Sequence, residues 1–212
     1  MSRLPAAKRR EQLLDCAAEL FSKAGYARAT TAELAKAAGV TEPIIYRHFK
    51  SKRDLFIALV ERGAERTLSQ WKQELRGAKD PAERLRRLMG DNQMVSAHGR
   101  DAYRVLLQSI TEVGDPLIHE AVQEHMKNLH AFLTKEIAAA QAEHRVMRVF
   151  SDEIIAWLLI YIGLGYGILT AMKIDEHGTD RDRRHVQDVI ARILVGRERR
   201  DDADRRKDDD SD

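Results

Sequence analysis

The chain has 212 residues, enough for one domain with a sizeable core or for two small domains. Its 36 basic and 34 acidic residues nearly cancel, yet residues 1–53 hold 11 basic against 5 acidic residues and the remainder holds 25 against 29. A basic amino-terminal part on an acidic body suggests a polyanionic partner for that part alone. The single cysteine, Cys16, excludes an internal disulfide, and the first residues lack the apolar segment of a signal peptide, so we expect a cytoplasmic protein.

Apolar residues recur at helical spacing along most of the chain, and no stretch alternates with a period of two, so we expect an all-α protein. The first helix is predicted at residues 7–24 and ends at Gly25. The second begins at Thr30, which has the spacing of a capping box with Glu33, and it ends at Gly39.

A short third helix is predicted within the run VTEPIIYRHF, residues 40–49, with Pro43 in its first turn. Ile45 and Phe49 are four residues apart and are expected to enter the core, while Tyr46 and its neighbours face outward. The turn AGVT joins this helix to the preceding one, which is a helix-turn-helix arrangement. An exposed apolar and aromatic surface on a short helix, beside a basic arm, suits the major groove of DNA.

The later helices are predicted to be longer. A fourth opens with Ser51 and Asp54 in a capping arrangement and runs past Trp71. Five more are expected at about 81–97, 101–113, 116–144, 152–174 and 182–195, two of them starting at a proline.

Three segments follow from this pattern: a DNA-binding domain at 1–53, a helical domain at 54–196 and a tail at 197–212. The tail holds 14 charged residues among 16 and is expected to be disordered.

Residues 154–172 contain no charge over 19 positions, which makes a helix of about 28 Å, close to the thickness of a bilayer core. The flanking residues are not basic clusters, so we favour a buried central helix over a membrane span. Small residues form one stripe along it and bulky residues form another. The small stripe comprises Ala156, Gly163, Gly167 and Thr170, and the bulky one Trp157, Tyr161, Leu164 and Ile168.

The segment GYARATTAELAKAAGVTEPIIYRHFKSKRDLF closely resembles the DNA-binding domain of the TetR family of transcriptional regulators. The resemblance covers about residues 8–60, roughly a quarter of the chain, and fixes the spacing at ten positions. These positions are Gly25, Thr30, Ala35, Gly39, Val40, Tyr46, His48, Phe49, Lys52 and Leu55.

The resemblance implies roles for the residues of the helix-turn-helix. Thr30 and Thr31 would bind phosphate at a helix N-terminus. Four residues would lie on base edges, with Glu42 accepting from cytosine: Thr41, Glu42, Pro43 and Ile44. Three would hold phosphates: Tyr46, His48 and Lys52. Tyr46 could instead cover the core, His48 could pack on the first helix, and Glu42 could simply face solvent.

The resemblance further implies a carboxy-terminal domain that dimerises and encloses a ligand pocket. We predict a mainly apolar inducer held by aromatic and methionine residues: Met89, Tyr103, Leu107, Trp157 and Tyr161. The dimer interface would combine the small stripe with the last helix: Ala156, Gly163, Gly167, Thr170, Val186, Val189, Ile190 and Ile193. The expected protein is a homodimeric regulator, most simply a repressor, of a palindromic operator in double-stranded DNA.

Two other interpretations stay open: a membrane-tethered helix-turn-helix protein anchored by residues 154–172, and a helical enzyme with an incidental helix-turn-helix. The sequence contains no glycine-rich phosphate loop and no nucleophile elbow, so we expect no enzyme. His119, His125 and His130 are five or six residues apart, which spreads them around a helix, and we expect no metal and no cofactor.

Overall fold

The computed structural model describes residues 4–90, 105–174 and 189, and every regular element in these ranges is helical. The helices and their bounds are α1 (Ala6–Ala24), α2 (Thr31–Ala38), α3 (Glu42–His48), α4 (Lys52–Glu74), α5 (Pro81–Gly90), the 3-10 helix η2 (Ser109–Glu112), α7 (Pro116–Ala142) and α8 (Asp152–Ala171). The predicted all-α fold is confirmed. The tail at 197–212 and most of the last predicted helix lie outside the described residues.

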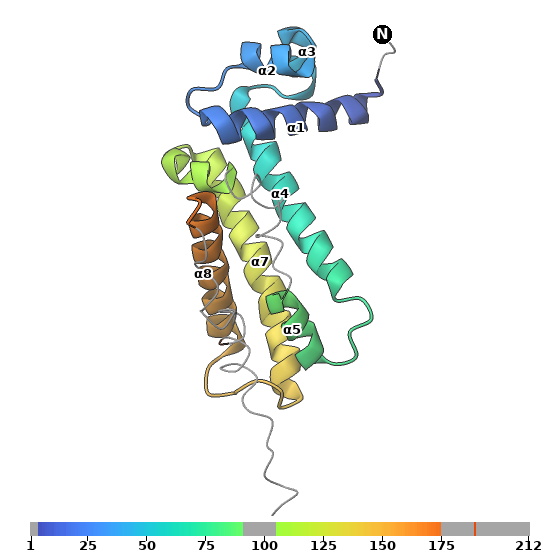
Figure 1. Cartoon of the computed structure of the whole chain (residues 1–212), viewed down its shortest axis with the longest axis vertical. Coiled ribbons are helices and arrows are strands. Elements are labelled where there is room, and N and C mark those ends of the chain that lie inside the picture. The colour runs from blue at the N-terminus through green and yellow to red at the C-terminus, as the bar shows by residue number, and fades with distance from the viewer. Residues whose placement is uncertain (1–3, 91–104, 175–188, 190–212) are drawn as a thin grey trace, which may run out of the picture.

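Helices α1, α2 and α3 form a small head at one end of the molecule, and α1 lies across the start of α4 (Figure 1). We call residues 6–60 the head, because the buried core of these three helices continues into α4 as far as Val60. The domain boundary predicted at residue 53 therefore falls inside one continuous helix. The largest fully buried side chains of the head include Leu13, Phe21 and Phe56.

The head core closes around three aromatic rings. Tyr26, in the loop after α1, packs between Phe21 and Phe56, with ring centroids 5.6 and 4.6 Å away. Such tilted and edge-on pairs add to the energy of burial. They fix α4 against the end of α1, and Arg62 of α4 also pairs with Asp15 of α1 at 2.8 Å.

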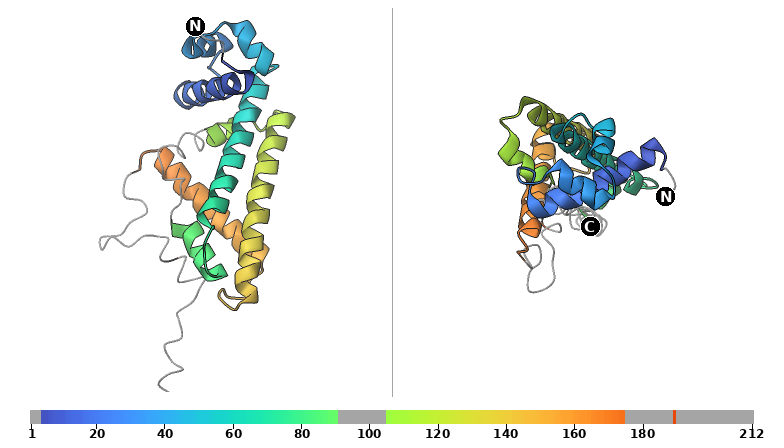
Figure 2. Two further views of the ribbon diagram at one scale, coloured as in Figure 1. Left: turned by 90° about the vertical axis from the view of Figure 1, so that its right-hand side faces the viewer. Right: turned by 90° about the horizontal axis from the view of Figure 1, so that it is seen from above.

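The remaining part of α4 and helices α5, α7 and α8 form the elongated body (Figures 1 and 2). Its core joins residues of α5, α7 and α8 with the end of α4, and Leu85, Ile137 and Ala156 are fully buried there. Helix α4 is thus shared: its first turns belong to the head core and its last residues to the body core.

A buried ion pair joins α5 to α7. The Arg84 guanidinium donates to both carboxylate oxygens of Glu136, at 2.6 and 2.8 Å, and also to the carbonyl of Leu75. The Glu136 side chain is 8% exposed, so a bidentate contact is needed to offset the loss of water around its charge.

The segment before α7 connects the body to the head. The side-chain amide of Gln108 accepts from the Tyr26 backbone N–H at 2.8 Å and donates to the Phe21 carbonyl at 2.7 Å. Arg53 of α4 pairs with Asp115 at 3.2 Å. The head and body are therefore joined by more than the shared helix.

The predicted helix starts are confirmed where the structure describes them. Helices α5 and α7 begin at Pro81 and Pro116, and the Asp115 carboxylate caps the first turn of α7. Predicted helix 101–113 differs at its end, where residues 109–112 form a 3-10 turn. Asp115 can take the N-cap position of α7 because the chain tightens in this turn.

Candidate nucleic-acid interface

Helices α2 and α3 form the helix-turn-helix, and local sequence chemistry explains its shape. The predicted capping box is present: the Thr30 hydroxyl accepts from the Glu33 N–H, and the Glu33 carboxylate accepts from the Thr30 N–H. Gly39 ends α2 with φ +63°, in the left-handed region that favours glycine. The following N–H, of Val40, donates back to the Ala35 carbonyl at 2.9 Å and closes the turn.

Helix α3 buries one side and presents the other to solvent. Ile45 and Phe49 are 1% and 4% exposed, as their spacing predicts. Thr41, Pro43 and Tyr46 are exposed, while Ile44 and His48 are half-buried. A helix of seven residues is too short to be stable alone, so the two buried anchors hold its outer face in place.

Thr41 occupies the N-cap position of α3, and its side chain makes no capping hydrogen bond. A threonine hydroxyl at this position usually binds a backbone N–H of the first turn. Here the hydroxyl remains available to a partner outside the chain.

Thr31 links α2 to the outer face of α3. Its hydroxyl donates to Glu42 Oε2 at 2.7 Å and lies 3.2 Å from the Tyr46 hydroxyl. Glu42 is half-buried rather than free in solvent. Sequence reasoning assigned Thr31 and Tyr46 to phosphates and missed this contact, which joins residues 11 and 15 positions apart.

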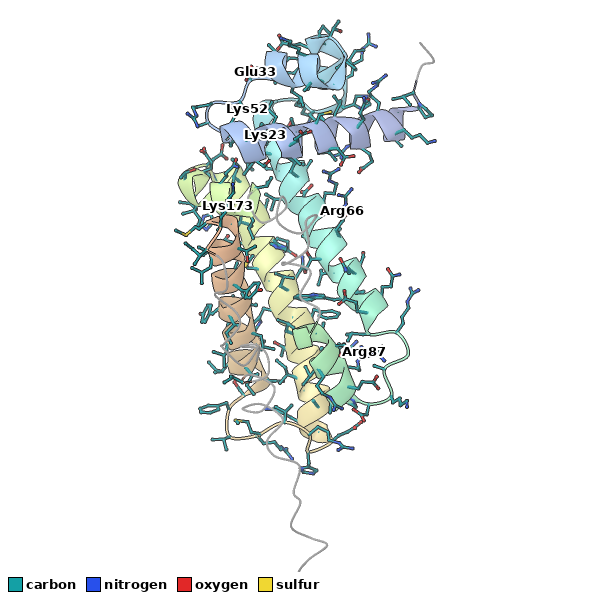
Figure 3. The ribbon with its side chains drawn as sticks, in the orientation of Figure 1. Lys23, Glu33, Lys52, Arg66, Arg87 and Lys173 are labelled. Atoms are coloured by element: carbon teal, nitrogen blue, oxygen red, sulfur yellow. The ribbon has the colours of Figure 1, made fainter. Side chains whose placement is uncertain are left out.

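Lys52 makes contacts within the head that its sequence position did not predict. Its ammonium donates to the carbonyls of Tyr26, Ala27 and Ala29, at 3.0, 3.3 and 3.1 Å, and lies 4.5 Å from the centre of the Tyr26 ring. An ammonium has three N–H donors, and three acceptors lie within reach in the chain. Lys52 therefore fastens the loop between α1 and α2 (Figure 3), and its contact with phosphate stays a prediction.

Two other cations stand at the carboxy-terminal end of α3. Arg47 and Lys50 are exposed, and neither pairs with another residue in the part of the chain that the structure describes. Arg10 of α1 stacks over the Phe49 ring at 4.7 Å, next to them. Arg47 and Lys50 flank His48 in the sequence, and this position beside a predicted phosphate contact could have identified them as further phosphate contacts.

The aromatic residues predicted to line a ligand pocket do not point into the body together. Trp157 of α8 stacks on His130 of α7 and on Tyr161, with ring centroids 4.6 and 5.9 Å apart. Tyr161 is 63% exposed in the single chain, and its place in a pocket lining stays a prediction. Leu107 is half-buried, whereas Tyr103 and the side chain of Met89 lie outside the described residues.

The small stripe of α8 faces inward. Ala156, Gly163 and Gly167 are buried within the single chain, and their part in a dimer interface stays a prediction. The Thr170 hydroxyl donates to the Tyr166 carbonyl of its own helix. Val189 is exposed, and the other predicted interface residues, Val186, Ile190 and Ile193, lie outside the described residues.

Helix α8 is not buried on all sides, contrary to the prediction. Its outward positions form an apolar stripe at helical spacing, which we call the α8 stripe: Ile154, Leu158, Tyr161, Gly165, Leu169 and Met172. By length and composition α8 is the one candidate membrane span within the described ranges, and 28% of its apolar window is buried. Small residues face inward because α7 packs against α8, and Ile155 and Ile160 are buried beside them.

The described residues show no metal-binding cluster: no group of three or more His, Cys, Asp or Glu residues there could hold an ion. His125 of α7 is 9% exposed, and its Nδ1 has no hydrogen-bond partner among the residues described by the structure. Burial lowers the pKa of the His125 imidazole to about 4, so the ring is neutral near pH 7.

Comparison with known proteins agrees with this geometry. Residues 13–59 match the family model of bacterial regulatory proteins of the tetR family. The HTH-type transcriptional activator FasR of Mycolicibacterium smegmatis is 36% identical over 108 residues, 51% of this chain and 49% of that protein. The nucleoid occlusion factor SlmA of Marinobacter nauticus is 45% identical over 80 residues, 38% of this chain and 41% of that protein. The chain spans about half the length of these curated relatives or less.

Solved structures extend the likeness to the whole fold. A transcriptional regulator from Saccharomonospora viridis in complex with choline has a TM-score of 0.77 at 25% identity, covering 90% of this chain and all of that one. The fatty acid degradation regulator FadR from Bacillus halodurans has a TM-score of 0.74 at 20% identity, covering 94% and 99%. The body is therefore similar to known proteins in architecture, and the head is similar in sequence as well.

Proposed function

We propose that this chain, which belongs to the TetR family of bacterial transcriptional regulators, binds an operator in double-stranded DNA through α3 and regulates transcription in response to a ligand. The observation that carries the proposal is the outer face of α3. Two buried anchors hold it rigid, and its exposed polar and apolar groups stand beside unpaired cations.

The outer face of α3 has the chemistry of a major-groove reader. Pro43 and Ile44 offer apolar contacts to thymine methyl groups, and Thr41 and Glu42 offer polar contacts to base edges. His48, with Arg47 and Lys50, supplies contacts to phosphates that fix the register. The Thr30 hydroxyl takes part in the capping box, so the main role of Thr30 is to stabilise the start of α2. A phosphate can still bind at this helix N-terminus.

We propose that the protein works as a homodimer on a palindromic operator, with the α8 stripe at the centre of the interface. One chain carries one reading helix, and specificity generally requires two half-sites. The α8 stripe is an apolar surface without charge on an otherwise charged chain, and such a surface marks a contact site. The regulators of this family usually act as dimers and are soluble cytoplasmic proteins, which favours this role over a membrane anchor.

The dimer is tested by placing a charge in the stripe. Leu158→Glu should give monomers by light scattering at micromolar concentration and should weaken operator binding at least a hundredfold, because two linked half-sites become independent. Ala139→Glu puts the same charge on the exposed face of α7 and should leave the dimer intact. A wild-type protein that needs detergent to remain in solution would instead support the membrane-tethered alternative.

We propose that the ligand is a small, mainly apolar inducer bound in the body between α4, α5, α7 and α8. The proposed lining consists of the residues predicted from the sequence: Met89, Tyr103, Leu107, Trp157 and Tyr161. His125 and Thr134 of α7 carry buried polar atoms without a partner among the described residues, and a ligand could satisfy them. The effect on transcription is proposed to be repression. FasR is named an activator, so a reporter placed behind the selected operator decides between the two signs.

The contacts between body and head would carry the response. A ligand that displaces the segment around Gln108 also moves the end of α1, because one amide binds both Phe21 and Tyr26. A hundredfold change in operator affinity requires about 2.7 kcal/mol of coupling, and operator DNA must then weaken ligand binding by the same factor.

The decisive experiment is selection from a random pool of double-stranded DNA by the purified chain. We expect a two-fold symmetric sequence whose affinity falls steeply with salt, because the contacts include several phosphates. A pool that stays random after repeated rounds would refute the proposal. Inducer candidates are then titrated with and without the selected operator, and equal affinities would exclude a compound.

A further inference from the structure

The contact between Thr31, Glu42 and Tyr46 has a definite direction. The Thr31 hydroxyl carries one hydrogen, which it donates to Glu42 Oε2 at 2.7 Å. At the 3.2 Å contact with Tyr46, the tyrosine hydroxyl is therefore the donor and Thr31 the acceptor. The result is a chain of two hydrogen bonds from Tyr46 through Thr31 to Glu42, which crosses from α3 to α2 and back.

This chain of bonds leaves one side of the Glu42 carboxylate unused. Oε2 accepts from Thr31, and Oε1 has no hydrogen-bond partner among the residues that the structure describes. An ionised carboxylate can only accept hydrogen bonds. Next to phosphates it is repelled, so on a DNA-reading surface its favourable partner is an amino group on a base edge.

The same contact reduces the freedom of Glu42. A free glutamate loses about 1.5–2 kcal/mol of rotamer entropy when it is fixed. Here the Thr31 bond fixes the carboxylate before DNA arrives, and the half-buried stem of Glu42 adds packing. A polar side chain that is fixed before DNA binds discriminates better between bases, because its contact with the base loses no free energy to ordering of the side chain.

We propose that Thr31, supported by Tyr46, is a positioning residue that holds Glu42 to read the amino group of a cytosine in each half-site. The inference rests on the proposed function and gives Thr31 and Tyr46 a role other than direct phosphate binding. It also explains why an acidic residue stands on the outer face of a head whose first 53 residues carry 11 basic and 5 acidic groups. Phosphate binding alone would favour a neutral or basic residue there.

The test compares base preference, and not only affinity, across matched variants. Random-pool selection is run with the wild type, Thr31→Val, Thr31→Ser, Glu42→Gln and the control Thr67→Val, which removes a threonine hydroxyl of α4 outside the head. We expect Thr31→Val and Glu42→Gln to lower the preference for cytosine at the same position of each half-site by roughly tenfold. Thr31→Ser keeps the hydroxyl and should keep the preference, as should Thr67→Val.

Four results would overturn the inference while the wild type still selects an operator. Thr31→Val could weaken binding to all sequences alike and reduce the salt slope, which is the signature of a phosphate contact. Thr31→Val could leave both preference and affinity unchanged. Glu42→Gln could leave the cytosine preference unchanged. Thermal unfolding of each variant confirms that the head is folded, and Thr31→Ser losing the preference would also count against the role. A wild type that selects nothing refutes the proposed function instead.

Discussion

The head and the body of this protein are built from the same kind of helix but differ in how completely they satisfy their own groups. In the head, α2 carries a capping box, the Lys52 ammonium has three acceptors, and the aromatic core is closed. In the body, two buried polar atoms of α7 have no partner among the described residues, and α8 leaves an apolar stripe outside. These body features are the ones that we propose for a ligand and for a second copy.

The head and the body also differ in how they resemble known proteins. Sequence likeness to the family is carried by residues 13–59, and the body is similar mainly in fold. A DNA reader must keep one geometry, so its local chemistry is recognisable, whereas a ligand site and an interface vary with their partners.

The largest expected effect at neutral pH breaks the body at the ion pair between Arg84 and Glu136. Glu136→Ala removes the 8% exposed carboxylate and leaves the Arg84 side chain, which is 34% exposed, without its partner, and should cost about 1.5–3 kcal/mol of unfolding free energy. Urea denaturation measures the loss. The control is Glu124→Ala, which removes an exposed pair with Lys127 and should change stability by less than about 1 kcal/mol. Equal losses would mean that the buried pair does not hold the body together.

Acid should weaken the body through His125. The folded pKa of this ring is about 4, below its ordinary value of 6.5, so the unfolded chain takes up a proton at a pH where the folded chain does not. The destabilisation by His125 is close to zero well above pH 6.5 and grows as the pH falls. Near pH 4 it reaches about 3 kcal/mol of unfolding free energy.

His125→Leu should remove this part of the pH dependence and leave stability at pH 7 unchanged or higher, because an unpaired buried nitrogen is lost. His119→Leu, on the exposed side of the same helix, should keep the wild-type dependence. Urea denaturation from pH 7 to pH 4 compares the three proteins. Parallel curves for wild type and His125→Leu would show that the ring does not titrate as its burial requires.

Two glycine substitutions, one in the head and one in the body, should have opposite effects on stability. Gly39 has φ +63° in the turn of the head, so Gly39→Ala should cost about 1–2 kcal/mol, although nothing lies within 4 Å of the added methyl group. Gly165 stands inside α8 with open space around it, and Gly165→Ala should stabilise the chain by about 0.5–1 kcal/mol. Denaturation of both variants gives the signs. A destabilising Gly165→Ala would indicate that a second copy approaches the helix closely at this point.

An effect of similar size concerns the cap of α2. Thr30→Ala removes the capping box and should cost about 1 kcal/mol. Ser151→Ala removes the cap of α8 and should cost a similar amount. Operator binding distinguishes Thr30→Ala from Ser151→Ala, because α2 packs against α3 and α8 does not. If both variants bind operator equally well, the cap of α2 contributes stability but not recognition.

Local sequence was enough to predict most helices and the helix-turn-helix. The capping box, the left-handed Gly39 and the proline helix starts act within three or four residues, so their effect depends little on the rest of the chain. The inward direction of Ile45 and Phe49 followed from spacing alone. The same reasoning failed for α8, because an uncharged helix carries no polar side to show which face is outward.

What the sequence by itself determined is therefore the order of the described helices, most of their starts and the helix-turn-helix. Only the tertiary structure decided the partners of individual side chains. Lys52 turned to carbonyls 23 to 26 residues away, Thr31 met Glu42 across the turn, and Gly163 and Gly167 of α8 packed inward. These contacts join elements whose approach depends on how whole helices pack, and a helix can pack on more than one side until its neighbours are in place.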